Sequence, residues 1–251
     1  MTETETLPTI ERLRHELRRR RLTVTQTARL TPHMLRVTLT GPELADFVSA
    51  APDDHVKLFL ETGDGEPEKR DYTPRRFDAA RGELTLDFAL HEAGPATAWA
   101  LQAVPGSELT VAGPRGSQRI SGPIAEWLLI GDETALPAIG RRIEEMAAGT
   151  KVTALIAVPE PADEQQFDTG AALCCQWLHR PVAAAAEAAP FLSALAERPI
   201  APGTFVWIAA EASVARAVRS YLLDERGHPL PWLKAAGYWR QGQANAHEKI
   251  E

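Results

Sequence analysis

The sequence of 251 residues contains only two cysteines, Cys174 and Cys175, which are neighbours in the chain. Iron–sulfur clusters need a set of thiolates, and structural zinc sites need several Cys or His ligands at close spacing, so neither kind of metal site is expected. The seven histidines are scattered and show no H-x-x-x-H spacing. Adjacent cysteines form only a strained disulfide, so we expect two reduced thiols on a strand. Any electron chemistry must therefore use an organic cofactor.

Long apolar runs are also absent, and the amino-terminal segment lacks the apolar core of a signal peptide. We therefore expect a cytoplasmic protein that does not insert into a membrane. The net charge of -7 argues against general binding to nucleic acid. A basic cluster at residues 18–21 follows an amphipathic stretch at 10–17, and we interpret residues 1–21 as a helical extension with a solvated end rather than a nucleic-acid arm.

Residues 22–120 show the alternation of apolar and polar residues that is typical of antiparallel strands. Turn-rich segments such as 62–65 separate the alternating runs. This pattern predicts an antiparallel sheet or small β-barrel. The apolar positions that alternate are Leu35, Val37 and Leu39, then Val56, Leu58 and Leu60, then Leu84, Leu86, Phe88 and Leu90.

Residues 121–242 instead alternate between strands and helices. Helical periodicity is clearest around Ile139 and Ile143 and from Val214 to Leu222, and residues 183–197 are expected to be helical around Pro190. Such alternation predicts a parallel α/β sheet with helices on its faces. The expected fold class is therefore β plus α/β, with a seam near 116–123 and a frayed polar tail at 243–251. Short buried strands are expected at 127–130, 152–158, 171–177 and 204–210.

The segment 70–75 concentrates groups that suit a ligand with a flat ring and a pyrophosphate. Tyr72 can lie against the ring and Thr73 can hydrogen-bond to its edge, while Arg70 and Arg75 can clasp phosphate oxygens. By itself the segment also fits a surface strand with an aromatic–arginine pair.

A second candidate segment, residues 91–100, follows a strand and precedes a short helix. Backbone N–H groups at a helix start, next to a glycine that lets a ligand approach, form an anion site. A further turn at 113–117 adds backbone donors and a cation, although a plain interdomain turn explains it as well. The candidate residues in these two segments are His91, Gly94, Ala96, Thr97, Trp99, Arg115, Gly116 and Ser117.

In the α/β half, residues 130–137 place a strand end, a glycine turn and a helix start at the carboxyl edge of the sheet, where such folds bind ligands. No G-x-G-x-x-G fingerprint is present, so a nicotinamide would be held loosely. Near the carboxyl terminus, Tyr238 and Trp239 either form a hydrophobic plug or cover a bound ring. Further candidates here are Asp132, Thr134 and Ala135, and Arg141 or Arg142 for the 2′-phosphate of NADP.

In this order, the motifs resemble those of the siderophore-interacting protein family, FAD-dependent ferric-siderophore reductases related to ferredoxin–NADP reductases. The resemblance spans residues 22–242. It implies an FAD-binding β-barrel at 22–120, an NAD(P)H-binding α/β domain at 121–242, and electron transfer by FAD without a catalytic side chain. The implied cofactor-binding residues are Arg70, Tyr72, Thr73, Arg75, His91, Gly94, Ala96, Thr97, Trp99, Gly116, Ser117, Asp132, Thr134, Ala135, Tyr238 and Trp239.

The implied substrate is a ferric siderophore, which is strongly anionic when its ligands are catecholates. Lys57, Arg115 and Arg240 are the cations expected to attract it, although ordinary surface cations explain them equally well. Where the family pattern has a glycine after the histidine, this chain has Glu92, whose charge weakens an anion site unless it points to solvent. The alternatives are a general NAD(P)H:flavin or ferric reductase and a ferredoxin-fed flavin electron-transfer protein. We expect a monomer.

Overall fold

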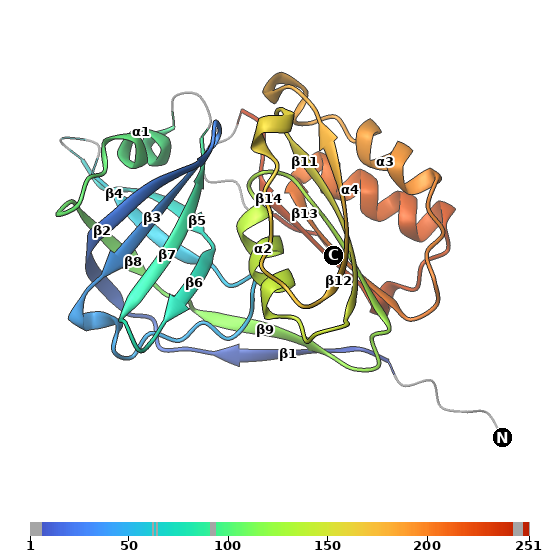
Figure 1. The fold of residues 1–251 in the computed structure, drawn as a ribbon, viewed down its shortest axis with the longest axis horizontal. Coiled ribbons are helices and arrows are strands. Elements are labelled where there is room, and N and C mark those ends of the chain that lie inside the picture. The colour runs from blue at the N-terminus through green and yellow to red at the C-terminus, as the bar shows by residue number, and fades with distance from the viewer. Residues whose placement is uncertain (1–6, 62, 64, 91–93, 243–247, 251) are drawn as a thin grey trace.

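The structure is a computed structural model that describes residues 7–61, 63, 65–90, 94–242 and 248–250. It consists of a β half and an α/β half that lie side by side (Figure 1). A two-stranded ribbon of β1 (Thr9–Arg14) and β9 (Gly116–Ser121) runs along one side of both halves. The predicted fold class is confirmed.

The β half is a curled antiparallel sheet of seven strands in the order β5-β4-β8-β2-β3-β7-β6. The alternating positions are buried except Leu90, which is half-buried, and Val37, Leu58 and Phe88 are 0% exposed. The short helix α1 (Pro95–Gln102) covers one end of the sheet and packs Ala96 and Ala100 against this core (Figure 1). The strands are β2 (Arg19–Thr31), β3 (Met34–Thr40), β4 (Val56–Leu60), β5 (Glu68–Tyr72), β6 (Pro74–Asp78), β7 (Glu83–Ala89) and β8 (Glu108–Ala112).

The α/β half is a six-stranded sheet in the order β12-β11-β10-β13-β14-β15, parallel except for β15. Helix α2 (Leu136–Glu145) covers the face toward the β half, whereas α3 (Ala189–Ala196) and α4 (Ala212–Ser220) cover the opposite face (Figure 1). No helix in the described part of the chain is long and apolar enough to cross a bilayer. The strands are β10 (Glu126–Gly131), β11 (Lys151–Val158), β12 (Ala172–His179), β13 (Thr204–Glu211), β14 (Leu233–Trp239) and β15 (Glu248–Ile250), and the short helical turns are η1 (Pro42–Leu44), η2 (Pro161–Asp163), η3 (Val182–Ala184), η4 (Tyr221–Glu225) and η5 (Leu230–Trp232).

The predicted amino-terminal helix is wrong. Residues 9–14 form β1, which pairs antiparallel with β9, and the basic cluster continues into β2. The cluster is not a solvated helix end either, because Arg20 is only 4% exposed and alternates with exposed neighbours in the same way as Leu22 and Val24. A helical spacing of apolar residues was overridden here by backbone pairing with a distant strand.

Of three smaller predictions, two are corrected and one agrees with the structure. The helix expected at 183–197 forms only from Ala189, and Pro190 occupies its first turn, where proline is tolerated. Residues 248–250 are not frayed, because they pair antiparallel with β14, while 243–247 and 251 lie outside the described residues. The two cysteines lie on β12 as free thiols, as predicted.

Buried polar contacts join the two halves. Asp53, in the loop before β4, contacts Lys234 of β14 and Arg142 of α2. Arg141 donates to the backbone oxygens of Ser49 and Pro74, each at 3.0 Å. Helix α2 is therefore fixed against the β half by its own arginines, which sets where the carboxyl edge of the parallel sheet faces.

Candidate functional site

A row of three aromatic rings brings two of the predicted motifs together. The Tyr72 ring, at the end of β5, has its centroid 4.4 Å from that of Phe88 in the barrel core. The centroid of Phe88 lies 5.6 Å from that of Trp99 on α1. Burial raises the pKa of the Tyr72 hydroxyl above its ordinary value. The β5–β6 corner and the short helix α1 therefore form one continuous region, and the cofactor role that the family resemblance implies for both stays a prediction.

Polar groups flank Tyr72 at this corner. The Arg70 side chain is 19% exposed; its guanidinium pairs with Glu68 and donates to the Lys69 backbone oxygen at 2.9 Å. Thr73 connects β5 to β6 and is buried, and its hydroxyl has no hydrogen-bond partner among the described residues. The corner thus offers a cation and an uncommitted hydroxyl beside an aromatic ring.

Helix α1 begins at a glycine with open space beside it. Gly94 is the N-cap and no side chain caps the helix, whose first residue is Pro95. A Cβ added at Gly94 would meet no atom within 4 Å. Ala96 is buried against the barrel core, and Thr97 and Trp99 are half-buried. His91, Glu92 and Ala93 lie outside the described residues.

Arg75, which the sequence analysis expects to clasp phosphate, has protein partners in this structure. Its guanidinium is buried and donates to both carboxylate oxygens of Glu144 on α2, at 2.7 and 2.6 Å. Asp87 lies 3.6 Å away. Arg75 therefore joins the two halves of the protein, and its role toward the cofactor stays a prediction.

Gly116 and Ser117 also serve the fold. A Cβ at Gly116 would lie 2.3 Å from the backbone oxygen of Leu13, so β1 approaches too closely for any other residue. The buried Ser117 hydroxyl donates to Asp54 at 2.7 Å and contacts the His15 ring nitrogen at 2.7 Å. The space beside Gly116 and the hydroxyl of Ser117 are thus used by the fold, and the expectation that these two residues bind cofactor stays a prediction.

Asp132 ties three strand ends together at the carboxyl edge of the parallel sheet. One of its carboxylate oxygens accepts from the Thr134 backbone N–H at 2.9 Å and from the Thr134 hydroxyl at 2.6 Å. The other oxygen accepts from the Glu211 backbone N–H and from the Trp239 indole, both at 2.9 Å. Asp132 and Ala135 are buried and Thr134 is half-buried, so Asp132 organises this turn, and the cofactor contacts expected for the three residues stay a prediction.

The carboxyl-terminal aromatics are held by this edge and by the seam. Trp239 is tethered through Asp132, and Tyr238 makes an edge contact with Trp207 at a centroid distance of 6.1 Å. Burial, together with the nearby Asp53 carboxylate, raises the pKa of Tyr238 well above its ordinary value. Both side chains therefore have structural partners, consistent with the plug interpretation.

The predicted substrate cations differ in their surroundings. Lys57 points away from the barrel core and pairs with Asp71 at 2.7 Å. The register places Lys57 opposite Asp71 and Val56 opposite Tyr72, so Lys57 and Tyr72 occupy opposite faces of the sheet. Arg115 and Arg240 are exposed.

The arginines suggested for a 2′-phosphate are unavailable. Arg141 donates to Ser49 and Pro74, and Arg142 pairs with Asp53 at 3.2 Å and lies over the ring of Trp127. Both are 7% exposed. This expectation is corrected: both side chains hold the seam.

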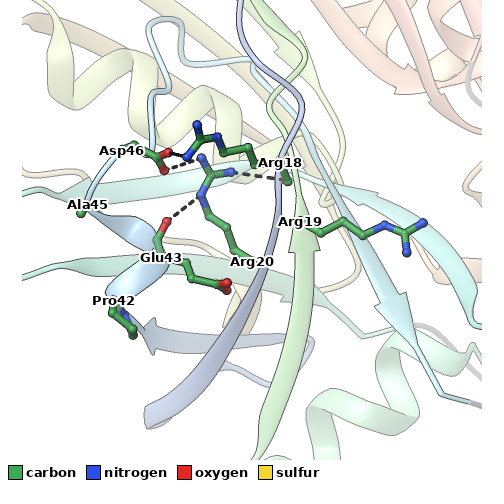
Figure 2. Close-up of a pocket in the computed structure, with 7 residues that line it drawn as sticks. All are labelled: Arg18, Arg19, Arg20, Pro42, Glu43, Ala45 and Asp46. Atoms are coloured by element: carbon green, nitrogen blue, oxygen red, sulfur yellow. Dashed lines mark hydrogen bonds and ion pairs between the residues drawn. The ribbon is translucent and has the colours of Figure 1, made fainter.

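A hollow of about 300 Å³ opens beside the start of β2 and the η1 turn (Figure 2). Arg20 fills much of its polar wall, because it donates to the Glu43 backbone oxygen at 2.8 Å and to Asp46 at 2.9 Å. Arg18 also pairs with Asp46, whereas Arg19 points away and lies 4.4 Å over the ring of Phe59 (Figure 2). The charges facing this hollow are already neutralised, so we assign it no ligand.

A buried ion pair at the carboxyl edge was missed from the sequence. Arg180 donates to Glu133 at 3.0 Å, and both side chains are almost fully buried. Burial and the neighbouring Asp132 carboxylate together raise the pKa of Glu133 to about 7, while Arg180 opposes the shift. The signal was an acidic residue in the turn after one strand and an arginine directly after another.

One group of side chains in the described part of the chain has the makings of a metal site. His33, Glu160 and Asp163 place one nitrogen and two carboxylate oxygens within 4.8 Å of one another. The His33 ring lies 2.7 Å from the Asp163 carboxylate, whose other oxygen accepts from the His33 backbone N–H at 2.9 Å. These bonds link the β2–β3 turn to the segment after β11.

Comparison with known proteins gives consistent results across the chain. Residues 124–242 match the family model described as siderophore-interacting protein, and residues 23–69 and 61–118 match the siderophore-interacting FAD-binding domain. The chain is 34% identical to the NADPH-dependent ferric-chelate reductase of Escherichia coli (strain K12), covering 91% of this chain and 96% of that protein. It is 29% identical to the ferric vibriobactin reductase ViuB of Vibrio cholerae, over 85% of this chain and 86% of that protein.

Solved structures agree with these matches. A siderophore utilization protein from T. fusca superposes with a TM-score of 0.86 at 37% identity, covering 95% of this chain and 98% of that one. The siderophore-interacting protein SipS from Aeromonas hydrophila gives a TM-score of 0.78 at 29% identity, covering 90% and 93%. From the family models, the identity and the shared fold together, the chain belongs to the siderophore-interacting protein family.

Proposed function

We propose that this chain is an FAD-dependent ferric-siderophore reductase that passes electrons from NAD(P)H to chelated Fe(III). The observation that carries the proposal is the ring row Tyr72, Phe88 and Trp99, which unites the β5–β6 corner with the start of α1. The match to an FAD-binding family model and the names of the ferric reductases among the relatives support it. We assign FAD binding to residues 22–120 and nicotinamide binding to residues 121–242.

The residues at the corner fit FAD. Tyr72 presents an aromatic ring that Phe88 holds in place, and the uncommitted Thr73 hydroxyl can hydrogen-bond to the edge of a flat ring system. Arg70 and the uncapped start of α1 suit the diphosphate, and the open space beside Gly94 lets a phosphate approach the backbone. When bound, FAD converts the two-electron chemistry of a nicotinamide into the one-electron chemistry of iron.

Other residues of the chain shape the donor side. Asp132 links the ends of β10, β13 and β14, and so sets their arrangement at the carboxyl edge where α/β sheets bind ligands. The contacts of α2 with Ser49 and Pro74 hold this edge against the β half. We propose NAD(P)H as the donor, with ferredoxin as a further donor to be tested.

The iron is substrate and arrives wrapped by its chelator, so the protein needs no ligands of its own for it. Reduction to Fe(II) weakens its hold on hard oxygen donors and lets it leave the chelator. We propose that the exposed Arg115 and Arg240, together with Lys57, attract the anionic chelate. We further propose a cytoplasmic monomer with no nucleic-acid partner.

Anaerobic absorption spectroscopy of the FAD-loaded protein tests the function. Addition of NADPH or NADH is expected to bleach the flavin bands, and a ferric siderophore is expected to restore them while a ferrous-specific dye reports Fe(II). Restoration by free flavin but not by the siderophore would instead indicate a general flavin reductase. Bleaching by reduced ferredoxin but by neither nicotinamide would indicate a ferredoxin-fed protein.

The substrate cations are tested separately by steady-state kinetics. The double variant Lys57→Ala/Arg240→Ala is expected to raise the KM for an anionic ferric chelate at low salt, with FAD content unchanged, because it removes two attractive charges. Arg81→Ala removes an exposed cation that pairs with Glu83 and serves as the matched control. An unchanged KM in the double variant would remove these residues from the substrate site.

A further inference from the structure

The Glu133–Arg180 pair occupies a defined place at the carboxyl edge of the parallel sheet. Glu133 lies in the turn after β10 and Arg180 directly follows β12, while β11 lies between these two strands. The Arg180 backbone N–H donates to the oxygen of Val158 at the end of β11, at 3.0 Å. Its side chain therefore reaches across the end of β11 to Glu133, at 3.0 Å.

Three polar atoms of this pair have no hydrogen-bond partner among the described residues: Oε1 of Glu133, and Nε and Nη1 of Arg180. Both residues are 3% exposed, so water does not solvate these atoms from the surface. Asp132 cannot supply the missing bonds, because it lies 3.9 Å from Arg180 and both of its oxygens already accept from other groups. Buried polar groups are almost always paired, so a cluster of unpaired ones indicates a missing partner.

We propose that Glu133 and Arg180 together recognise the carboxamide of the nicotinamide donor. The pair offers spare donors on Arg180 and a spare acceptor on Glu133, side by side. A primary carboxamide has the complementary set, a carbonyl oxygen that accepts and an NH₂ group that donates. The location agrees with the rule that α/β sheets bind ligands at the carboxyl ends of their strands. The inference rests on the proposed function, because that function supplies the nicotinamide.

The same geometry discriminates against a carboxylic acid of the same shape. A nicotinic-acid ring bears a carboxylate, which has no donor for ionised Glu133 and places a like charge beside it. The two ligands are therefore compared above pH 7, where Glu133 is ionised. A single bridging water would also satisfy the three atoms, but it would give no preference between amide and acid. Entry of the ring requires a local opening of the edge, and this cost is the same for both ligands.

Isothermal titration of the FAD-loaded protein with oxidised dinucleotides tests the inference. The ligands are NADP⁺ and NAD⁺, each compared with its nicotinic-acid analogue. The wild-type protein is expected to prefer the amide by about tenfold or more, because a site built to pair a donor rejects an analogue that lacks it. In Glu133→Gln the side-chain NH₂ can donate to the acid, so the preference is expected to fall to about threefold or less, or to reverse.

The matched control is Glu197→Gln, an exposed carboxylate at the end of α3, which should keep the wild-type preference. Equal binding of amide and acid by the wild type, or a full amide preference in Glu133→Gln, would overturn the inference. Even if Glu133→Gln does not fold, equal binding of amide and acid by the wild type still overturns the inference. Flavin bleaching by NAD(P)H separates this inference from the proposed function. If the proposed function fails, NAD(P)H does not bleach the flavin; if only this inference fails, NAD(P)H still bleaches it.

Discussion

Asp53 is the residue whose replacement should reveal most about how the two halves are joined. Its side chain is 7% exposed and contacts three groups from the α/β half. These are the Lys234 ammonium, the Arg142 guanidinium at 3.2 Å and the Trp207 indole N–H at 3.2 Å. Burial opposes ionisation of Asp53, but the two cations and the indole more than compensate and lower its pKa.

Asp53→Asn removes the charge while keeping the volume and one acceptor for Trp207. Removing one partner of a buried ion pair costs roughly 3–5 kcal/mol, because the opposite charges remain buried without compensation. Because the Asn amide oxygen can still accept from the Trp207 indole, we expect a loss in the free energy of unfolding at the lower end of this range, about 3 kcal/mol. For a chain of this size, that loss corresponds to a fall in Tm of roughly 6–12 °C.

Scanning calorimetry and urea unfolding measure the effect, with Asp71→Asn as the matched control. Asp71 also pairs with a lysine, but its side chain is 29% exposed, so the control should lose at most about 1 kcal/mol. Because the pKa of Asp53 is lowered on folding, its contribution is present above the unfolded pKa and lost as pH falls through the folded pKa. The gap between wild type and variant should therefore narrow below about pH 4. A difference under about 1 kcal/mol at pH 7 would refute the reasoning.

Two further substitutions test whether Gly116 and Ser117 stabilise the fold. Gly116→Ala forces a Cβ against the backbone oxygen of Leu13, so it should lower the free energy of unfolding by about 1–3 kcal/mol and expose β1 to proteolysis. The control Gly65→Ala has open space beside it and should change the free energy of unfolding by less than about 0.5 kcal/mol. Equal stabilities of the two variants would contradict the close approach. Ser117→Ala deprives buried Asp54 of a donor and should cost about 1–3 kcal/mol in urea unfolding with FAD affinity unchanged. A tenfold loss of FAD affinity, on the order of 1.4 kcal/mol, would place Ser117 at the cofactor site.

Much of the fold could be predicted from the sequence because burial follows periodicity. Val37, Leu58 and Leu86, at the centres of the three alternating runs, are each 0% exposed, so a period of two marked the inner face of the sheet correctly. The strand–helix alternation after Pro123 likewise indicated a parallel sheet.

The amino-terminal strand could not be predicted by the same reasoning. Residues 9–14 are mostly exposed, so no buried face marks them as a strand, and their backbone is fixed by pairing with β9 about a hundred positions later. A local pattern carries no information about a partner so far along the chain.

The candidate site likewise contains some features that the sequence indicates and others that depend on contacts between distant parts of the chain. Tyr72 and Trp99, which the family resemblance assigns to one cofactor, lie in one row of rings through Phe88. The pairing of Arg75 with Glu144 could not be predicted, because residue type shows that a guanidinium seeks an anion, but not which anion provides the contact. The pairing of Glu133 with Arg180 depends on the strand order of the sheet, which motif spacing does not reveal.

Equilibrium titration of the apoprotein with FAD, followed by flavin fluorescence, tests the central claim most directly. The account predicts saturable binding of a single FAD per chain and an affinity at least about tenfold lower in Arg70→Ala, which loses a charge-assisted contact to phosphate. Arg76→Ala, whose side chain is 74% exposed on β6, should bind as the wild type does. Absence of FAD binding by the wild type, or equal affinity of wild type and Arg70→Ala, would contradict the account.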